Sequence, residues 1–507
     1  MSSPLGHEPG SGVTGAHFVD VASLAELCRH SCGNFKWLRY QESDIFTEWN
    51  IAIDKEGSYA HQIREEILQS LNMSLGYDAI FKMRCSAGLR IKAYLPKTKS
   101  QGEIKDDGIS DSPELVLSCI MPDTCIAIEL DHRIGGIPNA LEEDGRRSSD
   151  SIAYLQTALL YTTAFGNRRV RVTTLALKVT SSIPTIFDAA NFDALTAFMT
   201  RQAISDIFDQ GSLHRARQKI LNRCVSILSK YRKHGEVQAS PGQLILPEAL
   251  QLMPLFCLSL LKSRMFRSSL AKISSSTCKP SPTADERAFH LWFSSNVSPA
   301  ISMLSVHPSL YELSNMTSDV GEPVLFKARR TGQSGQTDVD GHFEQDELDR
   351  LSCEPYIQLP PSTKPSVACM RPDGVYLLDD GFRFFLFVGR DVSIDARSEF
   401  LTFEEVSDTG QRHVSISTSS DFGSRVWNVI SQLRKSYRCS TLEKFERPLY
   451  SPVIVVIGSG GAGFRTVIDS ALEEEMIESL VEDTSSDGKN YEEFLIDIFN
   501  RVKNATM

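Results

Sequence analysis

The stretch "VYLLDDGFRFFLFVG", residues 375 to 389, holds two apolar runs on either side of Asp380-Gly381. An Asp-Gly pair suits the positive φ angles of a type I′ turn, so the pattern predicts a β-hairpin. Helix-like residues 424 to 436 follow, and the β-branched run 453 to 457 predicts one more strand. This part of the chain is therefore expected to form a small α/β domain.

The chain before the hairpin changes to a helical period between 184 and about 310. One helix is marked by Leu195, Phe198, Met199, Ile204, Ile207 and Phe208, and another by Ala216, Ile220, Cys224, Ile227, Leu228 and Tyr231. Pro247 can open a third helix that runs to about Met265. Residues 314 to 365 are polar and rich in Gly, Ser, Asp and Pro, which indicates a linker or long loop.

A β-rich region lies further upstream. Its expected strands are in 77 to 95, 124 to 132, 152 to 163 and 168 to 179, joined by long polar connections. The first two stretches alternate polar and apolar residues at period two, as half-buried strands do. Several short strands with such connections indicate an antiparallel sandwich or barrel.

The segments before the β-rich region and at the C-terminal end of the sequence also contain patterns that predict secondary structure. Residues 18 to 27 predict a strand that enters a helix or turn. Residues 56 to 73 predict an amphipathic helix, because Ile63, Ile67 and Leu71 are spaced four apart. At the other end, Phe494, Leu495, Ile498, Phe499 and Val502 share one face of an expected helix.

Composition limits the class of protein. Apolar residues make up 41% and charged residues 23% of 507 residues, the balance of a globular protein with room for roughly three or four domains. The net charge of −11 argues against binding of nucleic acid by the whole protein. Eleven cysteines without a C-x-x-C pair indicate reduced thiols in a cytosolic protein. The start has no secretory signal, and the chain has no run of 18 apolar residues.

Two motifs resemble ligand sites without meeting their requirements. Cys28, His30 and Cys32 lack a second ligand pair at zinc-finger spacing, so no metal site is expected. Gly458 to Gly463 fit the dinucleotide fingerprint, but only 44 residues follow and no second parallel strand is expected among them. Phe464 stands where a phosphate-binding loop needs lysine. The glycines are therefore interpreted as a turn after a strand, and no catalytic signature is found elsewhere.

Six stretches together resemble one family. "FVDVASL", "GYDAIFKMRCSAGLRI", "LQTALLYTTAFGNRRVRVTTLAL", "PGQLILPEALQLMPLFCLSLLKS", "DERAF" and "GVYLLDDGFRFFLFVG" occur in the order and roughly at the spacing of the cargo-adaptor subunit of the COPII vesicle coat. The resemblance covers about residues 17 to 502. The family's F-L-W-V-G in the hairpin is similar to Phe385-Leu-Phe387-Val-Gly389 here.

The resemblance implies a multidomain α+β fold. Its expected parts are a disordered start (1–16), the C-terminal remnant of an α/β trunk (17–73), a β-sandwich (74–182), an all-α helical domain (183–313), a linker or long loop (314–365), a gelsolin-like α/β domain (366–475) and a C-terminal helix (476–507). The family's zinc ribbon and most of its trunk would lie upstream. The chain is thus expected to be N-terminally truncated relative to the family, and no cofactor is expected in it.

The resemblance also implies a role without catalysis. The family's adaptor pairs with a paralogous GTPase-activating subunit and is recruited to the endoplasmic reticulum membrane and its exit sites by a Sar-type small GTPase. It captures cytoplasmic sorting signals of membrane cargo and SNAREs for transport to the Golgi and contacts the outer coat. A cytosolic, peripherally membrane-bound protein that does not bind nucleic acid is therefore expected.

The expected cargo-binding residues are Lys82 and Arg84. Strand alternation places them with Ile80 on one face, while Phe81 and Met83 point to the core. Two cations about 7 Å apart can hold two carboxylates of one extended peptide. The resemblance implies such a role, because basic residues on this strand are similar to those that read acidic export signals in the family. The alternative is an ordinary solvated strand face.

Two other basic stretches are not expected to bind a ligand. Arg168, Arg169 and Arg171 are interpreted as strand-end charges near a turn, and the Lys/Arg-rich segment 201–233 as a solvated helix face. Three further hypotheses are kept: the paralogous GTPase-activating subunit, a nucleotide-binding enzyme using Gly458–Gly463, and an actin-severing gelsolin relative. The lysine-serine end of "LILPEALQLMPLFCLSLLKS" favours the adaptor over its paralogue.

Overall fold

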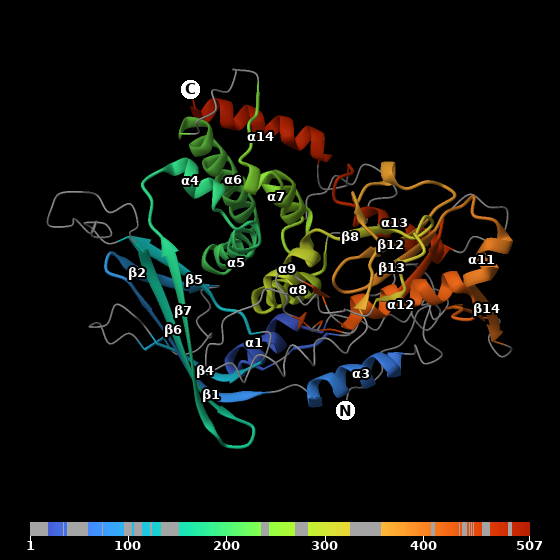
Figure 1. Ribbon diagram of the computed structural model, residues 1–507, viewed down its shortest axis with the longest axis horizontal. Helices are drawn as coiled ribbons and strands as arrows, with labels where there is room; N and C mark the ends of the chain where they lie inside the picture. The colour runs from blue at the N-terminus through green and yellow to red at the C-terminus, as the bar shows by residue number, and fades with distance from the viewer. Residues whose placement is uncertain are drawn as a thin grey trace, which may run out of the picture.

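The computed structural model describes residues 19–33, 35–37, 59–72, 75–95, 104–105, 114–121, 124–132, 152–234, 243–268, 282–324, 356–406, 411–435, 437–438, 444–445, 447, 449, 451–458, 467–484 and 489–506. Three bodies lie side by side in Figure 1: a β-sandwich on the left, a group of helices at the top, and an α/β unit on the right. The predicted α+β architecture is confirmed for these three parts.

The β-sandwich consists of two antiparallel sheets. Its strands are β1 (Gly76–Cys85), β2 (Leu89–Leu95), β3 (Ile104–Lys105), β4 (Glu114–Ile120), β5 (Ala127–His132), β6 (Ile152–Thr163) and β7 (Arg168–Lys178). The larger sheet has the order β3-β4-β1-β6-β7, and β2 pairs with β5. The predicted stretch 77–95 splits into β1 and β2 at a turn in which Gly88 has a φ of 91°. Ala79, Met83 and Tyr94 are buried between the sheets.

The helical part is built around α6. Its elements are α4 (Ile183–Asp188), α5 (Phe192–Gln210), α6 (Leu213–His234), the 3-10 turn η1 (Glu248–Leu250), α7 (Met253–Lys262), α8 (Ala284–Asn296) and α9 (Pro299–Val306). The C-terminal helix α14 (Tyr491–Thr506) packs across α6 (Figure 1). The third predicted helix is shorter than expected: Pro247 precedes only η1, and α7 begins at Met253 with Pro254 in its first turn.

The C-terminal α/β unit has a five-stranded sheet of order β11-β8-β12-β13-β18. The strands are β8 (Ser309–Glu312), β11 (Ser362–Thr363), β12 (Val375–Asp379), β13 (Phe384–Val388) and β18 (Val453–Ile457), and β18 runs parallel to β13. The helix α12 (Asp421–Lys435) covers one face of the sheet and α13 (Val467–Glu478) the other. Both hairpin strands are therefore buried on both faces, which explains their unbroken apolar runs.

Two details of this unit differ from the sequence analysis. The hairpin is present, but Asp380 to Arg383 connect its strands and only Gly381 has a positive φ, of 83°. The turn is therefore not type I′, which needs a positive φ at two consecutive residues. The Asp380 carboxylate stabilises the loop by accepting the backbone N–H groups of Phe382 and Arg383, at 2.9 and 2.6 Å. In addition, β8 was expected in the helical domain but pairs with β12 in this sheet.

Shorter elements complete the unit. They are β9 (Pro323–Val324), β10 (Tyr356–Ile357), the 3-10 turn η2 (Val367–Cys369), α11 (Ile394–Phe400), β14 (Leu401–Val406), β15 (Gln411–Ile416), β16 (Tyr437–Arg438) and β17 (Lys444–Phe445). Part of the expected linker thus forms the β9–β10 and β8–β11 pairs. Its central residues 325–355 lie outside the described residues.

The described N-terminal residues form two helices, α1 (Val21–Ser31) and α3 (Tyr59–Asn72). Of the strand expected to enter a helix or turn within 18–27, the helix is confirmed as α1, whereas the described residues 19 and 20 before it form no strand. The Asp285 carboxylate accepts the backbone N–H groups of Val19 and Val21, each at 2.8 Å. The helix expected at 56–73 is present as α3. Its apolar face is not buried as expected: Leu71 is 75% exposed, whereas Glu66 is buried in an ion pair with Lys36.

Candidate functional site

Lys82 and Arg84 lie on the outer face of the larger sheet of the sandwich. Met83 is buried, and Phe81 packs against the same core, so the predicted orientation of β1 is confirmed. Arg84 is exposed and has no partner among the described residues. At i and i+2 on one strand, the two cations are about 7 Å apart at their Cα atoms.

Lys82 has a partner that the sequence analysis missed. The pairing of β1 with β4 places Glu114 directly across from it, and the distance from Lys82 Nζ to Glu114 Oε1 is 2.9 Å. The side chains are 29% and 38% exposed, so water screens the pair. A peptide carboxylate that binds Lys82 therefore has to compete with Glu114. The apolar alternation of Leu115 and Leu117 was the signal for β4, but this stretch was included in the polar connection between the strands expected at 77–95 and 124–132.

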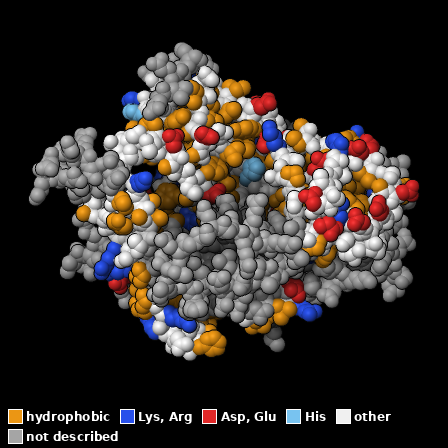
Figure 2. Space-filling model, in the orientation of Figure 1, with side chains coloured by type: hydrophobic (Ala, Val, Ile, Leu, Met, Phe, Trp, Pro, Cys, Tyr) orange, Lys and Arg blue, Asp and Glu red, His pale blue; other side chains and the backbone are white. Residues whose placement is uncertain are grey.

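The neighbouring strands form the rest of this surface. Ala158 of β6 lies opposite Lys82, and Gln156 lies opposite Arg84. On β7, Val172 lies opposite Ala158, and Thr174 lies opposite Gln156. The cations therefore stand at one side of a shallow surface with small, apolar and neutral polar side chains. In Figure 2, blue and orange side chains gather at the lower left, over the ends of these strands.

The arginines at the start of β7 separate into two groups. Arg168 is fixed by β1: its Nη1 lies 2.6 Å from Asp78 Oδ2 and 3.2 Å from the Asp78 carbonyl oxygen. Asp78 has a positive φ of 49° at the irregular position where β1 shifts register against β6, so Arg168 supports an unusual backbone conformation. Arg169 and Arg171 lie on the other face of the strand, because side chains alternate along it.

Some basic residues of the segment 201–233 form contacts within the protein. Arg201 is buried and donates to the Ser295 and Val297 carbonyl oxygens, at 3.3 and 2.6 Å. Lys219 and Arg223 each lie 2.6 Å from the Asp206 carboxylate. These contacts join helices and leave less of a free basic face than the sequence suggests.

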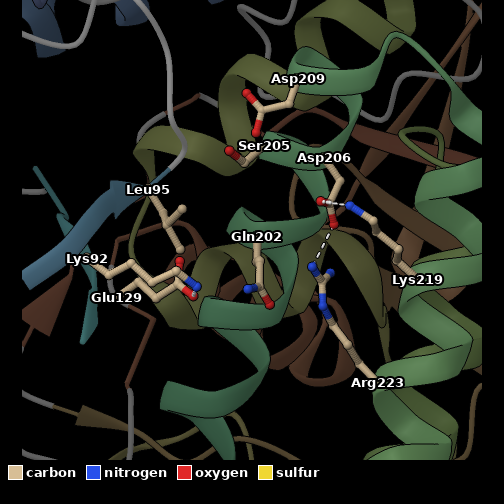
Figure 3. A pocket seen from close by; sticks show the side chains of 9 residues that line it. All are labelled: Lys92, Leu95, Glu129, Gln202, Ser205, Asp206, Asp209, Lys219 and Arg223. Carbon is tan, nitrogen blue, oxygen red and sulfur yellow. Dashed lines mark hydrogen bonds and ion pairs between the residues drawn. The ribbon is translucent and has the colours of Figure 1, made fainter. Parts of the chain in front are cut away.

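A cavity of about 240 Å³ lies between β2, α5 and α6 (Figure 3). Three of its lining side chains are cationic and three are anionic. Lys92 lies 2.6 Å from Glu129, whose hydrogen bond raises the pKa of this lysine, and Asp206 binds two further cations. These charges neutralise one another. We therefore interpret the cavity as part of a polar interface between the sandwich and the helices.

The glycine motif is only partly within the described residues. Gly458 follows β18 and donates its N–H to the Val388 carbonyl oxygen at 2.9 Å, while residues 459–466 lie outside the described residues. A Cβ at Gly458 would lie 3.0 Å from the Phe387 ring and 3.1 Å from the Arg390 nitrogen. Close packing thus explains this glycine without a nucleotide.

The described part of the chain shows neither a metal-binding cluster nor a membrane-spanning helix. No group of three or more His, Cys, Asp or Glu there could hold a metal ion. Among the described helices, none is both long and apolar enough to cross a membrane.

Comparison with known proteins gives agreement over most of the chain. The Sec23/Sec24 β-sandwich domain matches residues 76–180, and the Sec23/Sec24 helical domain matches residues 191–304. Protein transport protein Sec24A of Bos taurus is 26% identical over 486 residues, which are 96% of this chain and 36% of the relative. Protein transport protein SEC24 C of Arabidopsis thaliana is 25% identical over 498 residues, 97% of this chain and 35% of the relative.

A solved structure shows the same fold. The human COPII-coat protein Sec24c superimposes with a TM-score of 0.66 and 21% identity, over 97% of this chain and 52% of that chain. The chain spans about a third of the length of the curated relatives it matches. The chain therefore contains the Sec23/Sec24 β-sandwich and helical domains, and it is similar to Sec24 proteins along nearly its whole length.

Proposed function

We propose that this chain is a non-catalytic cargo adaptor of a COPII-type coat, which selects membrane proteins for transport from the endoplasmic reticulum to the Golgi. The likeness to Sec24 proteins along nearly the whole chain supports this role. The alternatives, the paralogous GTPase activator and a nucleotide-binding enzyme, are not favoured, because the relatives named above are all Sec24 proteins and close packing accounts for Gly458.

The observation that carries the proposal is the surface around Lys82 and Arg84. Arg84 is exposed, and Lys82 is held only by a half-exposed ion pair. An extended peptide repeats its side-chain direction every second residue, as β1 does. Two acidic residues separated by one residue can therefore meet Arg84 and Lys82 together. In this role the two cations read an acidic sorting signal of membrane cargo or a SNARE.

The expected partners follow from the same role. The chain binds the GTPase-activating subunit of the coat, and a Sar-type small GTPase recruits the pair to the cytosolic face of the endoplasmic reticulum. Contact with the membrane is peripheral, the outer coat assembles on the pair, and neither a cofactor nor nucleic acid takes part.

The binding test uses the full chain and a fluorescent peptide with a Glu-Xaa-Glu sequence. Replacement of Lys82 and Arg84 by alanine is expected to weaken binding about tenfold or more, because each removes a charge-assisted hydrogen bond. The matched control is Arg90→Ala with Lys92→Ala. These residues are also two apart on one strand, but they lie in the other sheet, where each is paired with a carboxylate. Equal binding by wild type and the Lys82/Arg84 variant, or an equal loss in the control, would contradict the assignment.

The partner test is separate. Tagged chain is incubated with cytosol, and the GTPase-activating subunit is identified by mass spectrometry. Recovery of that subunit by wild type and by the Lys82/Arg84 variant supports the coat role independently of the peptide site. Failure to recover it from either, with no binding of the Glu-Xaa-Glu peptide, would reject the adaptor function.

A further inference from the structure

The α/β unit is inserted between two helices of the helical part. In the described part of the chain, the first crossing runs from the end of α9 at Val306 to the start of β8 at Ser309, and the second leads from α13 back to α14. Short connections of this kind can serve as hinges, because a few residues between elements absorb the change of backbone angles in a domain motion. Side-chain contacts across the joint therefore have to hold the angle between the two parts.

An apolar contact lies next to the first crossing. The ring centre of Phe382, in the loop between β12 and β13, is 4.7 Å from that of Phe293 on α8, and Leu449 packs against the same cluster. Gly381 of this loop is close to α9, since a Cβ there would lie 3.3 Å from the Ser305 nitrogen. Apolar contacts have no preferred direction, so this contact, here called the pivot, holds the parts together without fixing their angle.

A second contact, made of charges, lies at the end of α7. Its cations are Lys262, Arg264 and Arg267. Lys262 is 6% exposed, and its Nζ atom donates to the Val481 and Asp483 carbonyl oxygens, at 2.8 and 2.5 Å. Arg267 Nη1 lies 3.0 Å from Glu478 Oε2, in the last turn of α13. The dipole of α13 also favours cations at this end of the helix.

Glu475 connects the two parts directly. Its Oε1 atom lies 2.9 Å from Arg264 Nη2 in the helical part and 2.9 Å from Arg383 Nη2 in the hairpin loop. Arg264 also binds Glu286 of α8 at 3.0 Å. These side chains are between 12% and 28% exposed, so salt screens their charges less than those of surface pairs. Loss of the Glu475 charge would leave two guanidinium groups close together without the anion that they share.

We propose that these charged contacts form a clasp that locks a hinge between the helical part and the α/β unit. The clasp consists of the side chains of Lys262, Arg264, Arg267, Arg383, Glu475 and Glu478 with the Val481 and Asp483 carbonyl oxygens. While it is closed, the two parts form one rigid body. When it opens, the α/β unit rotates about the pivot and each part keeps its own core. Among the described residues, the buried core of the helices and the buried core of the sheet have no member in common.

The test measures the distance between the two parts in the full chain. Spin labels on non-natural residues replace Gln218 of α6 and Glu399 of α11, which are both exposed, and double electron–electron resonance gives the distance distribution. One narrow distribution is expected for the wild type. Glu475→Gln with Glu478→Gln should add a second component, because the ratio of open to closed molecules rises about tenfold or more for each charge-assisted contact that is lost. A distribution identical to that of the wild type would overturn the clasp.

Two variants that remove an ion pair inside one part are the matched controls. Asp497→Asn breaks a pair with Arg501 within α14, and Glu312→Gln breaks a pair with Arg371 within the α/β unit, each at 3.2 Å. Both should keep the wild-type distribution. A second component of equal size in the controls would show that general destabilisation, and not the clasp, separates the two parts.

An exchange of charges provides a further test. Arg267→Glu should open the hinge, and Arg267→Glu with Glu478→Arg should close it again, because the ion pair is restored in reverse. This exchange also serves if the Glu475/Glu478 variant does not fold. An unchanged circular dichroism spectrum is expected for every variant. Failure of the exchange to restore the narrow distribution, or loss of helical signal together with the second component, would contradict a hinge between two intact parts.

Discussion

Lys82 Nζ lies 2.9 Å from Glu114 Oε1, across the antiparallel pair β1–β4. Both side chains remain partly exposed, and such surface ion pairs contribute only about 0–1 kcal/mol. Glu114 thus occupies one half of the proposed peptide site without closing it. We therefore expect Glu114 to compete with an acidic ligand for Lys82 and so to weaken binding of that ligand.

Replacement of Glu114 by Gln tests this competition. The variant keeps the shape of the side chain and removes its charge, so affinity for the Glu-Xaa-Glu peptide is expected to rise by up to about fivefold. Fluorescence anisotropy at low and high salt measures the change, which should shrink as salt screens the charges. Weaker binding by Glu114→Gln would mean that Glu114 helps to form the site.

The buried pair of Arg447 and Asp379 predicts a large stability effect. The two side chains are 2% and 0% exposed, and Arg447 Nη1 lies 3.1 Å from Asp379 Oδ1. Arg447→Leu leaves the carboxylate buried without its partner, so the free energy of unfolding should fall by about 3–5 kcal/mol. Guanidinium denaturation measures this. Arg390→Leu, at an exposed arginine, should change little, and Arg447→Leu with Asp379→Leu should cost less than the single change.

The C-terminal helix α14 is expected to be part of the helical core. Ile498 is fully buried among residues of α6 and α7, whereas Ile496 on the same helix is 62% exposed. Ile498→Ala should lower the free energy of unfolding by about 2–5 kcal/mol, and Ile496→Ala by less than about 0.5 kcal/mol. Urea denaturation of both variants checks the difference. Equal effects would show that α14 does not pack on the helices in solution.

His307 predicts a pH dependence. Burial lowers the pKa of this histidine below 6.5, and its Nε2 atom is buried without a partner among the described residues. The unfolded chain therefore binds the proton first as the pH falls, so stability is lost from about pH 6.5 down to the folded-state pKa. The slope contributed by one such group is at most about 1.4 kcal/mol per pH unit. His307→Gln should flatten the dependence, measured by denaturation across this range.

The sequence predicted the type of most long elements in the described part of the chain. The helical periods around Ile220 and Ile498 and the β-branched run 453–457 each describe one element by itself, and all three are confirmed. The α3 helix shows the limit of this reasoning. Its period was recognised, but the direction of its apolar face was not, because the ion pair of Glu66 with Lys36 involves a residue 30 positions away.

Local pattern alone determined that β1 alternates, with Met83 inward and Lys82 and Arg84 outward, because a strand has a fixed two-residue period. Only the tertiary structure decided that Glu114 faces Lys82 and that Asp78 holds Arg168. These relations depend on which strands become neighbours and in which register. Strand neighbours and register depend on the burial of side chains from distant segments in one core, so they cannot be predicted from any single stretch of sequence.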